Sequence, residues 1–287
     1  MFLSLVSAYL NDLGGSGLYF QASLTPAEGK RIIGMGVAAM DAVQHALENG
    51  TIVIATSTTT AYVLEELLGK EIPDKGMFTA GVITARGCCL TDPEGRYGHH
   101  VIRKGEVTEM KTPELPKVLA KMGPEDVFIK GANAIDPFGQ AGILLGGVGG
   151  GTIGRSWGYI TANGITTIIA AGLEKLVPIS LSDAALKTGI ETVDGSLGMA
   201  VGMMVVGGSI ITEMEALKML TGVDAIPIGG GGIDGGEGSR TFVLEGPEDS
   251  VKAARDLICS IKGEPALKTV VKSCELCDAK CDYNQKT

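Results

Sequence analysis

Short apolar runs rich in β-branched residues alternate with amphipathic stretches along the first two thirds of the chain. Residues 51–55, 126–129 and 164–169 have the pattern of buried strands, and polar or glycine-rich loops stand next to them. Helical patterns separate the strands, and the first of these begins at Pro26 and ends near Gly50. Strands that alternate with helices typically form a parallel sheet. The pattern therefore predicts an α/β fold.

The order of elements changes at about residue 209. The segment 209–265 reads strand, helix, strand, glycine loop, strand and helix, with Pro247 at the start of the last helix. It predicts a smaller α+β subdomain that follows an α/β domain of residues 25–208. The opening MFLSLVSAYL is amphipathic, so we expect residues 1–24 to form an N-terminal helical segment. Residues 266–287 form a cysteine-containing tail.

Charge and composition narrow the class of protein. The formal net charge is −9 and the chain contains no block of Lys or Arg, which argues against nucleic acid as a partner. No apolar run reaches the roughly 18 residues that a membrane-spanning helix requires, so we expect no membrane partner. The six cysteines lack the spacing of an extracellular disulfide framework, which favours a cytoplasmic protein.

A run of hydroxyl residues connects the first predicted strand to the next helix. Backbone N–H groups at a helix N-terminus, joined by hydroxyl donors, can bind an anion. Helix capping alone needs only one such residue. The run exceeds that need, and we interpret it as a ligand-binding segment composed of Thr56, Ser57, Thr58, Thr59 and Thr60.

A glycine-rich loop precedes the predicted strand 164–169. So many glycines indicate a backbone that approaches a ligand closely. The segment Gly149–Gly154 also fits the G-x-G-x-x-G spacing of dinucleotide sites, with Glu174 about 20 residues further on, where a ribose-binding acid would stand. In a chain with 43 glycines this spacing is a weak signal. The predicted ligand-binding glycines are Gly146, Gly147, Gly149, Gly150 and Gly151.

Polar residues follow the predicted strand 126–129, where open α/β sheets bind their ligands. Lys130 and Asn133 stand there, together with Asp136. A partly desolvated lysine can act as a base, as a Schiff-base former or as an anion clamp. The alternative is a solvated lysine paired with Asp136. We name Lys130 and Asn133 as the candidate catalytic residues.

The order of these segments resembles ribose-5-phosphate isomerase A over roughly residues 50–178. The similar segments are the strand followed by TSTTT, then DVFIKGANAIDP, GILLGGVGGG and ITTIIAAGLEKLVP. The resemblance implies a mostly parallel, Rossmann-like sheet of the type shared by that isomerase, glucosamine-6-phosphate deaminases and CoA transferases, with a smaller α+β subdomain. The whole chain also looks like a prokaryotic family related to that superfamily, whose members often form homo-oligomers.

The positions that carry the isomerase reaction are replaced in this chain. Lys130 and Asn133 stand where the resemblance places acidic residues, and Leu145 stands where it places a lysine. The catalytic glutamate of that family falls near Arg155-Ser156, which leaves no carboxylate there. We therefore expect a protein that binds a small phosphorylated, carboxylated or CoA-linked metabolite, either as an isomerase-type or transferase-type enzyme or as a non-catalytic sensor, but not a ribose-5-phosphate isomerase.

The tail contains the pattern C-x₂-C-x₃-C. Two thiolates two residues apart form a recurring half-site for zinc and iron–sulfur clusters. The predicted metal ligands are Cys274, Cys277 and Cys281, and the fourth ligand could be Asp282, Cys259, a partner chain or an open position. The alternatives are a metal or redox protein that acts through these cysteines and a flexible tail with reactive thiols.

Two further pairs of residues are interpreted as structural. His99 and His100 are adjacent, so their side chains should point apart, and we expect them in a surface loop unless one reaches the cleft as an acid or base. Glu213 and Glu215 fall on different faces of a helix and are interpreted as charges of its N-terminal turn.

Overall fold

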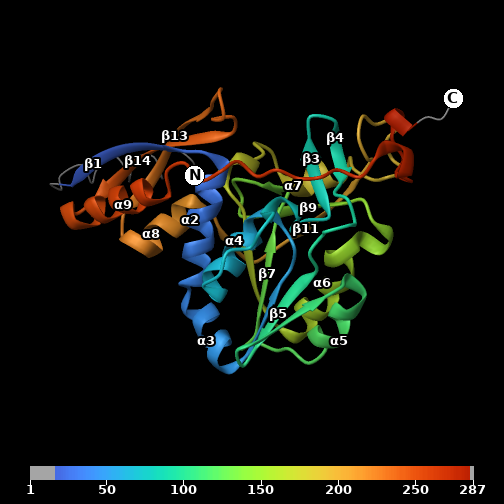
Figure 1. Ribbon diagram of the computed structural model, residues 1–287, viewed down its shortest axis with the longest axis horizontal. Helices are drawn as coiled ribbons and strands as arrows, with labels where there is room; N and C mark the ends of the chain where they lie inside the picture. The colour runs from blue at the N-terminus through green and yellow to red at the C-terminus, as the bar shows by residue number, and fades with distance from the viewer. Residues whose placement is uncertain (1–16, 285–287) are drawn as a thin grey trace.

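A six-stranded sheet forms the centre of the protein in the computed structural model, which describes residues 17–284 (Figure 1). Its strands follow the order β12–β10–β7–β2–β5–β6. The first four are mutually parallel, whereas β5 and β6 are antiparallel additions at one edge. The predicted α/β class with a mostly parallel sheet is therefore confirmed. The strands are β2 (Thr51–Ile54), β5 (His99–Arg103), β6 (Glu106–Met110), β7 (Val127–Gly131), β10 (Thr166–Ala170) and β12 (Ser209–Ile211).

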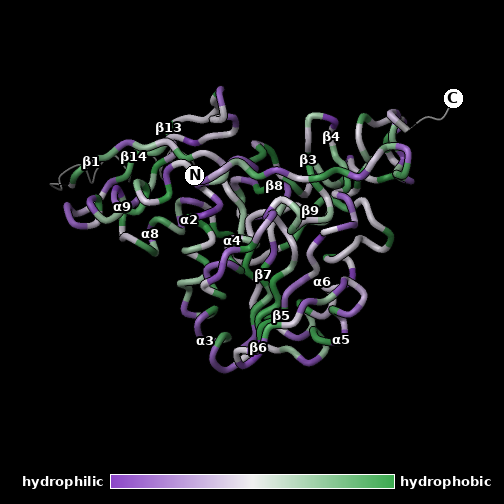
Figure 2. The backbone as a smooth tube through the Cα atoms, in the orientation of Figure 1, coloured by the Kyte–Doolittle hydropathy of each residue, from purple (hydrophilic) through white to green (hydrophobic). Residues whose placement is uncertain are grey.

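Helices cover both faces of this sheet. In Figure 1, α2, α3 and α4 lie on one side and α5 and α6 on the other. The central strands β2 and β7 are almost entirely buried, because they lie between two helical layers, and Figure 2 shows how apolar the chain is near β7 and β5. The helices are α2 (Pro26–Ala38), α3 (Asp41–Asn49), α4 (Thr58–Leu68), α5 (Leu115–Leu119) and α6 (Gly151–Asn163).

The helix expected from Pro26 to Gly50 is in fact two helices. Thr25 caps the first, and its side chain and that of Glu28 form a reciprocal capping box. The chain leaves the helical conformation at Met40, where the backbone is extended. The side chain of Gln44 donates to the Ala38 carbonyl, which satisfies an acceptor that the break leaves open.

A smaller unit consists of an antiparallel three-stranded sheet and two helices. Its strands, in the order β1–β14–β13, are β1 (Leu18–Leu24), β13 (Asp224–Gly231) and β14 (Ser239–Gly246), and its helices are α8 (Glu213–Thr221) and α9 (Glu248–Ile261). The elements predicted after β12 are all present. However, β12 itself joins the large sheet, so the small unit begins after it.

The N-terminal part of the chain differs from the expected helical segment 1–24. Residues 1–16 lie outside the described residues, and residues 18–24 form β1, which pairs with β14 along its whole length. The alternating pattern of LYFQASL explains this, since Phe20 and Ala22 pack against the core while their neighbours are exposed. The small unit therefore contains two distant parts of the chain.

Two small sheets extend beyond the carboxyl ends of the central strands. One is the hairpin of β3 (Gly81–Thr84) and β4 (Gly87–Leu90), and the other contains β8 (Ala134–Ile135), β9 (Ala141–Leu145) and β11 (Gly202–Val206), with the short helix α7 (Leu181–Ala185) beside it. These elements are not predicted by the sequence pattern.

Residues 264–272, which we call the strap, leave α9 and cross the molecule to the β3–β4 hairpin (Figure 1). The strap runs antiparallel to the segment after β4, with Thr91 opposite Val271. Backbone hydrogen bonds of 2.8 and 2.9 Å on either side of this pair hold it there. The predicted tail 266–287 is therefore packed against the body of the protein as far as it is described.

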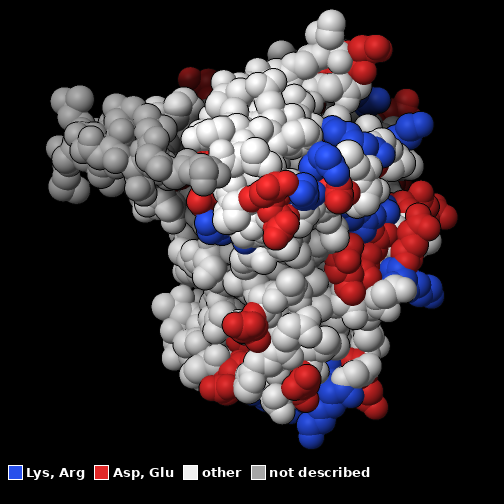
Figure 3. Space-filling model, turned by 90° about the vertical axis from the view of Figure 1, so that its left-hand side faces the viewer, with Lys and Arg blue, Asp and Glu red and all other residues white. Residues whose placement is uncertain are grey.

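The distribution of charge and the character of the helices follow the composition of the chain. Acidic and basic side chains are interspersed on the face that Figure 3 shows, which is the left-hand side of Figure 1. None of the helices in residues 17–284 combines the length and the apolar character that crossing a membrane requires.

Candidate functional site

A cavity of about 780 Å³ lies at the carboxyl ends of β2, β7 and β10, and the hairpin and the strap contribute to its walls. This volume is typical of a site for a small molecule. Parallel strands end at the same edge of a sheet, so the loops that follow them meet there. The cavity therefore collects residues from loops that are more than 100 residues apart in the sequence.

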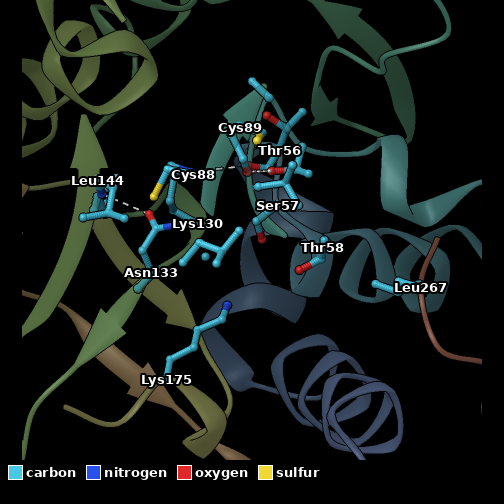
Figure 4. A pocket seen from close by; sticks show the side chains of 18 of the residues that line it. Thr56, Ser57, Thr58, Cys88, Cys89, Lys130, Asn133, Leu144, Lys175 and Leu267 are labelled. Carbon is cyan, nitrogen blue, oxygen red and sulfur yellow. Dashed lines mark hydrogen bonds between the residues drawn. The ribbon is translucent and has the colours of Figure 1, made fainter. Parts of the chain in front are cut away.

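The first three residues of the predicted hydroxyl segment line this cavity. Ser57 is the N-cap of α4, and its side chain accepts the N–H of Thr60 at 3.1 Å. Because Thr58 and Thr59 begin the helix, their N–H groups have no carbonyl partner within it. Thr56, Ser57 and Thr58 line the cavity, and Figure 4 shows them side by side.

The predicted ligand-binding role of Thr59 and Thr60 does not fit their positions. Both residues are fully buried beneath the cavity and do not line it. The Thr60 hydroxyl donates to the Ala55 carbonyl at 2.7 Å, which ties the end of β2 to the first turn of α4. The helical turn explains the difference, since it rotates these two side chains into the core.

Lys130 joins the end of β7 to the hydroxyl segment. Its Nζ donates to the Thr56 carbonyl at 3.3 Å. Burial, and then the charge of Lys175, lower the pKa of Lys130 to about 8. An amine with this pKa exchanges protons near neutral pH, so it can be an anion partner when protonated and a base when neutral.

Lys175 is a further amine at the same cavity, and the sequence pattern did not predict its role. It ends the 3₁₀ helix Leu173–Lys175 that follows β10. Burial lowers its pKa to about 8, although Glu174 opposes the shift. Its side chain lines the cavity together with Lys130 and Asn133, and Figure 4 shows it extending into the middle of this space. Lys175 stands five residues after the end of β10, so it lacks the position directly after a predicted strand that singled out Lys130.

Asn133 lines the cavity but is partly engaged in holding the backbone. Its Oδ1 accepts the N–H of Leu144 at 3.0 Å, as the dashed line in Figure 4 shows. This bond fixes the orientation of the amide and leaves its NH₂ group as the donor. Asn133 is therefore placed to orient a ligand rather than to transfer a proton. Asp136, in contrast, accepts three backbone N–H groups and does not pair with Lys130.

The glycine loop leads from β9 into α6 and lines the cavity at most of the predicted positions. Gly149, Gly150 and Gly151 have φ values of 68°, 75° and 58°, a left-handed conformation that favours glycine. The loop thereby brings the uncapped N-terminus of α6 to the cavity. Gly149 itself does not line it. The lining glycines are Gly146, Gly147, Gly150 and Gly151.

The structure lacks the parallel strand–helix–strand unit that a dinucleotide-binding site requires. The spacing is meaningful when the strand before the loop lies parallel to the strand after the helix. Here β9 pairs antiparallel with β11 in a separate sheet. Glu174 is held by Lys30 at 2.7 Å rather than standing alone.

A buried charge cluster adjoins the cavity. Glu174 accepts from Lys30, and its other oxygen, Oε2, is buried with no hydrogen-bond partner among the described residues. Glu213 is 3% exposed and accepts the N–H of Leu173 at 2.9 Å. Burial, and then Glu174, raise the pKa of Glu213. Glu213 stands in the N-terminal turn of α8, as interpreted from the sequence, but its side chain is buried against the 3₁₀ helix of Lys175, which the sequence did not predict.

The two adjacent histidines lie on β5 rather than in a surface loop. His99 is buried, its Nδ1 accepts the N–H of Thr56 at 3.1 Å, and its Nε2 contacts the Thr112 hydroxyl at 2.9 Å. Burial, and then Lys130, lower its pKa to about 3. His99 does not line the cavity, and as a neutral ring it positions Thr56. The ring of His100 lies 5.5 Å from that of Phe78.

The predicted metal ligands Cys274, Cys277 and Cys281 line a second, small pocket beside the cavity. Within residues 17–284, no group of three or more His, Cys, Asp or Glu side chains is arranged to hold a metal ion. The two residues suggested as a fourth ligand lie as follows. Cys259 lies exposed on α9, and Asp282 accepts the N–H of Ser196 at 2.9 Å.

Comparison with protein-family models, with curated proteins and with solved structures finds no match to this chain. The chemistry of the cavity is thus defined by its own residues. They include two amines that exchange protons near neutral pH, a third amine paired with a carboxylate that has one unpartnered oxygen, the hydroxyls of Thr56, Ser57 and Thr58, and two helix N-termini. Such a set binds negative charge and can move a proton at the bound molecule.

Proposed function

We propose that the cavity binds a small metabolite that carries a phosphate or carboxylate group. The observation that carries this proposal is the position of Lys130, whose amine lies 3.3 Å from the Thr56 carbonyl and thus beside the N-terminus of α4. A protonated amine and a helix N-terminus at one place both favour an anion. Lys175 adds a second positive charge at the same cavity.

Each wall has a separate role in this proposal. The first-turn N–H groups of α4 and the hydroxyls of Ser57 and Thr58 would hold the anionic group. Asn133 would donate to a neutral part of the ligand through its NH₂ group. The glycine loop allows the ligand to approach the backbone at the N-terminus of α6, where a side chain would occupy the space.

We further propose that the protein is an enzyme that moves a proton on this metabolite. Lys130 and Lys175 have pKa values of about 8, so each can give and take a proton near neutral pH. Glu174 supplies a carboxylate at the same wall. The resemblance to the sugar-phosphate isomerase and CoA-transferase superfamily supports this class. Turnover of ribose 5-phosphate is not expected, because Lys130 and Asn133 replace the acids of that isomerase.

Ligand binding can be tested by calorimetry with a panel of sugar phosphates, small carboxylates and acyl-CoAs. Lys130→Met removes the amine and should weaken binding of any hit about tenfold or more, whereas Thr58→Val removes one hydroxyl and should weaken it by roughly two- to tenfold. Lys117→Met, at an exposed position on α5, is the matched control and should have no effect. Equal affinity for the Lys130→Met and Lys117→Met proteins would refute the proposal.

A catalytic role is separable from binding by the same panel. An enzyme should convert the bound compound, whereas a sensor on the same fold would bind it without turnover. Exchange of a carbon-bound hydrogen with D₂O, followed by NMR, detects proton transfer even when the products are unknown. Exchange that disappears in Lys130→Met but persists in Lys117→Met supports the enzyme, and binding without any exchange supports the sensor.

A further inference from the structure

The charged side chains that line the cavity come from only some of its walls. Lys30 of α2 pairs with Glu174 at 2.7 Å, and Arg31 of the same helix holds Glu264, the first residue of the strap, at 3.0 Å. The others stand at the end of β7, in the 3₁₀ helix after β10 and in the loop between β13 and β14. Within residues 17–284 the charged lining residues are Lys30, Lys130, Glu174, Lys175, Glu237 and Glu264.

A different wall is formed by the β3–β4 hairpin, by β9 and by residues 199–201, which lead into β11. In Figure 1 the hairpin, β9 and β11 lie together on the side of the molecule away from the small unit. None of the lining residues that these described elements contribute carries a charge. We call the six largest apolar side chains on this side the apolar wall. They are Val82, Ile83, Leu90, Leu144, Met199 and Val201.

Met199 makes this wall continuous from the hairpin to the glycine loop. Its N–H donates to the Cys88 carbonyl at 2.6 Å, which fixes it to β4. Its side chain lies against Gly146, where an added Cβ atom would come within 2.7 Å of the Met199 sulfur. Gly146 therefore leaves room for the thioether, which covers the end of β9 with apolar surface.

Polar groups in and beside the apolar wall are already bonded to one another. The Thr79 hydroxyl donates to the Gly81 carbonyl at 2.9 Å, and the N–H of Leu144 donates to Oδ1 of Asn133 at 3.0 Å. The N–H of Met199 is used in the same way. These groups do not require a polar ligand, so what the wall presents to the cavity is mainly carbon and sulfur.

The cavity thus combines two kinds of surface in one volume of about 780 Å³. The charged side attracts an anion, whereas water against the apolar wall is displaced favourably by an apolar group. Each methylene buried in this way strengthens binding by about fourfold. A ligand that satisfies both sides must carry its charge at one end and a hydrocarbon chain at the other.

We propose that the cavity binds an anionic amphiphile, a phosphate or carboxylate that bears an unbranched hydrocarbon chain of several carbons. The anionic group lies at the N-terminus of α4 beside Lys130, and the chain lies along the apolar wall. This inference rests on the proposed function, because the same groups hold the anion. It narrows the ligand class, since a sugar phosphate would place hydroxyl groups against side chains such as Val82 and Met199 that cannot bond to them.

A series of n-alkylphosphonates from methyl to hexyl tests the chain and the head separately by calorimetry at pH 7. Affinity should rise about threefold or more for each added methylene. Lys130→Met should weaken every member of the series by a similar factor, because it alters only the site of the anion. Hexylamine carries the same chain with a positive charge and should bind at least about tenfold more weakly than hexylphosphonate.

Ile83→Asn removes part of the apolar wall at an exposed position, where the substitution should not disturb folding. It should weaken hexylphosphonate about threefold or more and leave methylphosphonate unchanged. Ile179→Asn is the matched control, since Ile83 and Ile179 are 63% and 54% exposed and Ile179 does not line the cavity. In protein labelled at the methionine methyl groups, the NMR signal of Met199 should shift with hexylphosphonate and stay in place with methylphosphonate.

The possible results separate this inference from the proposed function. Equal affinities for methylphosphonate and hexylphosphonate would overturn the inference while the proposed function stands. If no member of the series binds, the proposed function fails and the inference fails with it. Hexylamine that binds as tightly as hexylphosphonate, or a gain per methylene that is the same in Ile83→Asn as in the wild type, would also contradict the inference.

Discussion

Lys130 and Lys175 make the charge of the cavity depend on pH near neutrality. Their pKa values of about 8, lowered mainly by burial, mean that both amines are mostly protonated at pH 7 and mostly neutral at pH 9. Sulfate keeps its two negative charges over this range. We therefore expect sulfate binding, measured by calorimetry, to weaken by about tenfold or more between pH 7 and pH 9.

The variant Lys130→Met identifies which groups carry this effect. Its sulfate affinity should be lower at pH 7 and should change less with pH, because Lys175 is then the one remaining member of this pair of amines. The exposed Lys117→Met should follow the wild type. A wild-type affinity that is constant from pH 7 to pH 9 would show that these amines do not contact the anion.

Glu213 should make the folded state less stable as the pH rises. A carboxylate whose pKa is lowered by folding has the opposite effect. Burial, and then Glu174, raise its pKa in the folded state, so the unfolded chain loses this proton at a lower pH. The contribution to stability is fully present below the unfolded value and is lost as the pH rises through the folded value. Glu213→Gln cannot ionise and retains an oxygen for the N–H of Leu173.

Glu213→Gln should accordingly match the wild type at pH 4.5 and exceed it by about 1–3 kcal/mol in free energy of unfolding at pH 8. Urea denaturation at the two pH values measures the difference. Glu106→Gln, at an exposed position of β6, should change neither value by more than about 0.5 kcal/mol. Lower stability of Glu213→Gln at pH 8 would mean that the ionised carboxylate is the stabilising form.

The sequence predicts which residues line the cavity where residue type and position near the end of a strand are enough to identify them. Lys130, Asn133 and the hydroxyls up to Thr58 line one cavity because each lies at or near the carboxyl end of a buried strand. The Lys30–Glu174 pair was not predicted, since it depends on two segments 144 residues apart facing each other. The burial of Glu213 could not be predicted either, because it depends on the distant segment at Leu173.

At the scale of elements, glycines set the distance between the helices that surround the site. A Cβ atom at Gly36 of α2 would lie 2.6 Å from that of Ala216 on α8, and one at Gly34 would lie 2.8 Å from that of Tyr62 on α4. Helix α2 is therefore held closely between the large sheet's helical layer and the small unit. Alanine is intrinsically the better helix former by about 1 kcal/mol, so close packing must be the stronger effect.

Gly36→Ala should lower the free energy of unfolding by about 1–3 kcal/mol through overpacking. Gly158→Ala is the matched control, because Gly158 lies in α6 with nothing within 4 Å of its added Cβ. That substitution should raise stability by about 0.5–1 kcal/mol. Chemical denaturation measures the free energy of unfolding of both variants. A stabilising Gly36→Ala would show that α2 and α8 separate easily.

The elements that the sequence predicts well are those with a strong apolar period. The runs at β2, β7 and β10 are buried on both faces, so they are continuous and apolar. The break at Met40 carries neither Gly nor Pro, and tertiary packing rather than local signal sets it. The strands of the hairpin are half-buried and four residues long, too short for a periodic pattern.

At the scale of the whole molecule, the two units share α2 and should unfold together. This helix contacts α4 on the large sheet and α8 in the small unit. Leu244→Ala removes a fully buried side chain from β14 and should cost about 2–5 kcal/mol. Its unfolding, followed by far-ultraviolet circular dichroism and by the fluorescence of Trp157 in α6, should remain one coincident transition at a lower temperature. Two separate transitions would show that the units fold independently.

The pairing of β1 with β14 has a consequence for how the chain acquires its structure. Leu18 meets Gly246, so the ring of chain that this contact closes spans most of the sequence. Contacts so distant along the chain form slowly, because the entropy of closing the ring opposes them until nearly everything between is in place. During synthesis β1 is made more than 200 residues before its partner β14, so its edge stays unpaired in the meantime. Until β14 has been made, a growing chain is thus open to association through the unpaired edge of β1.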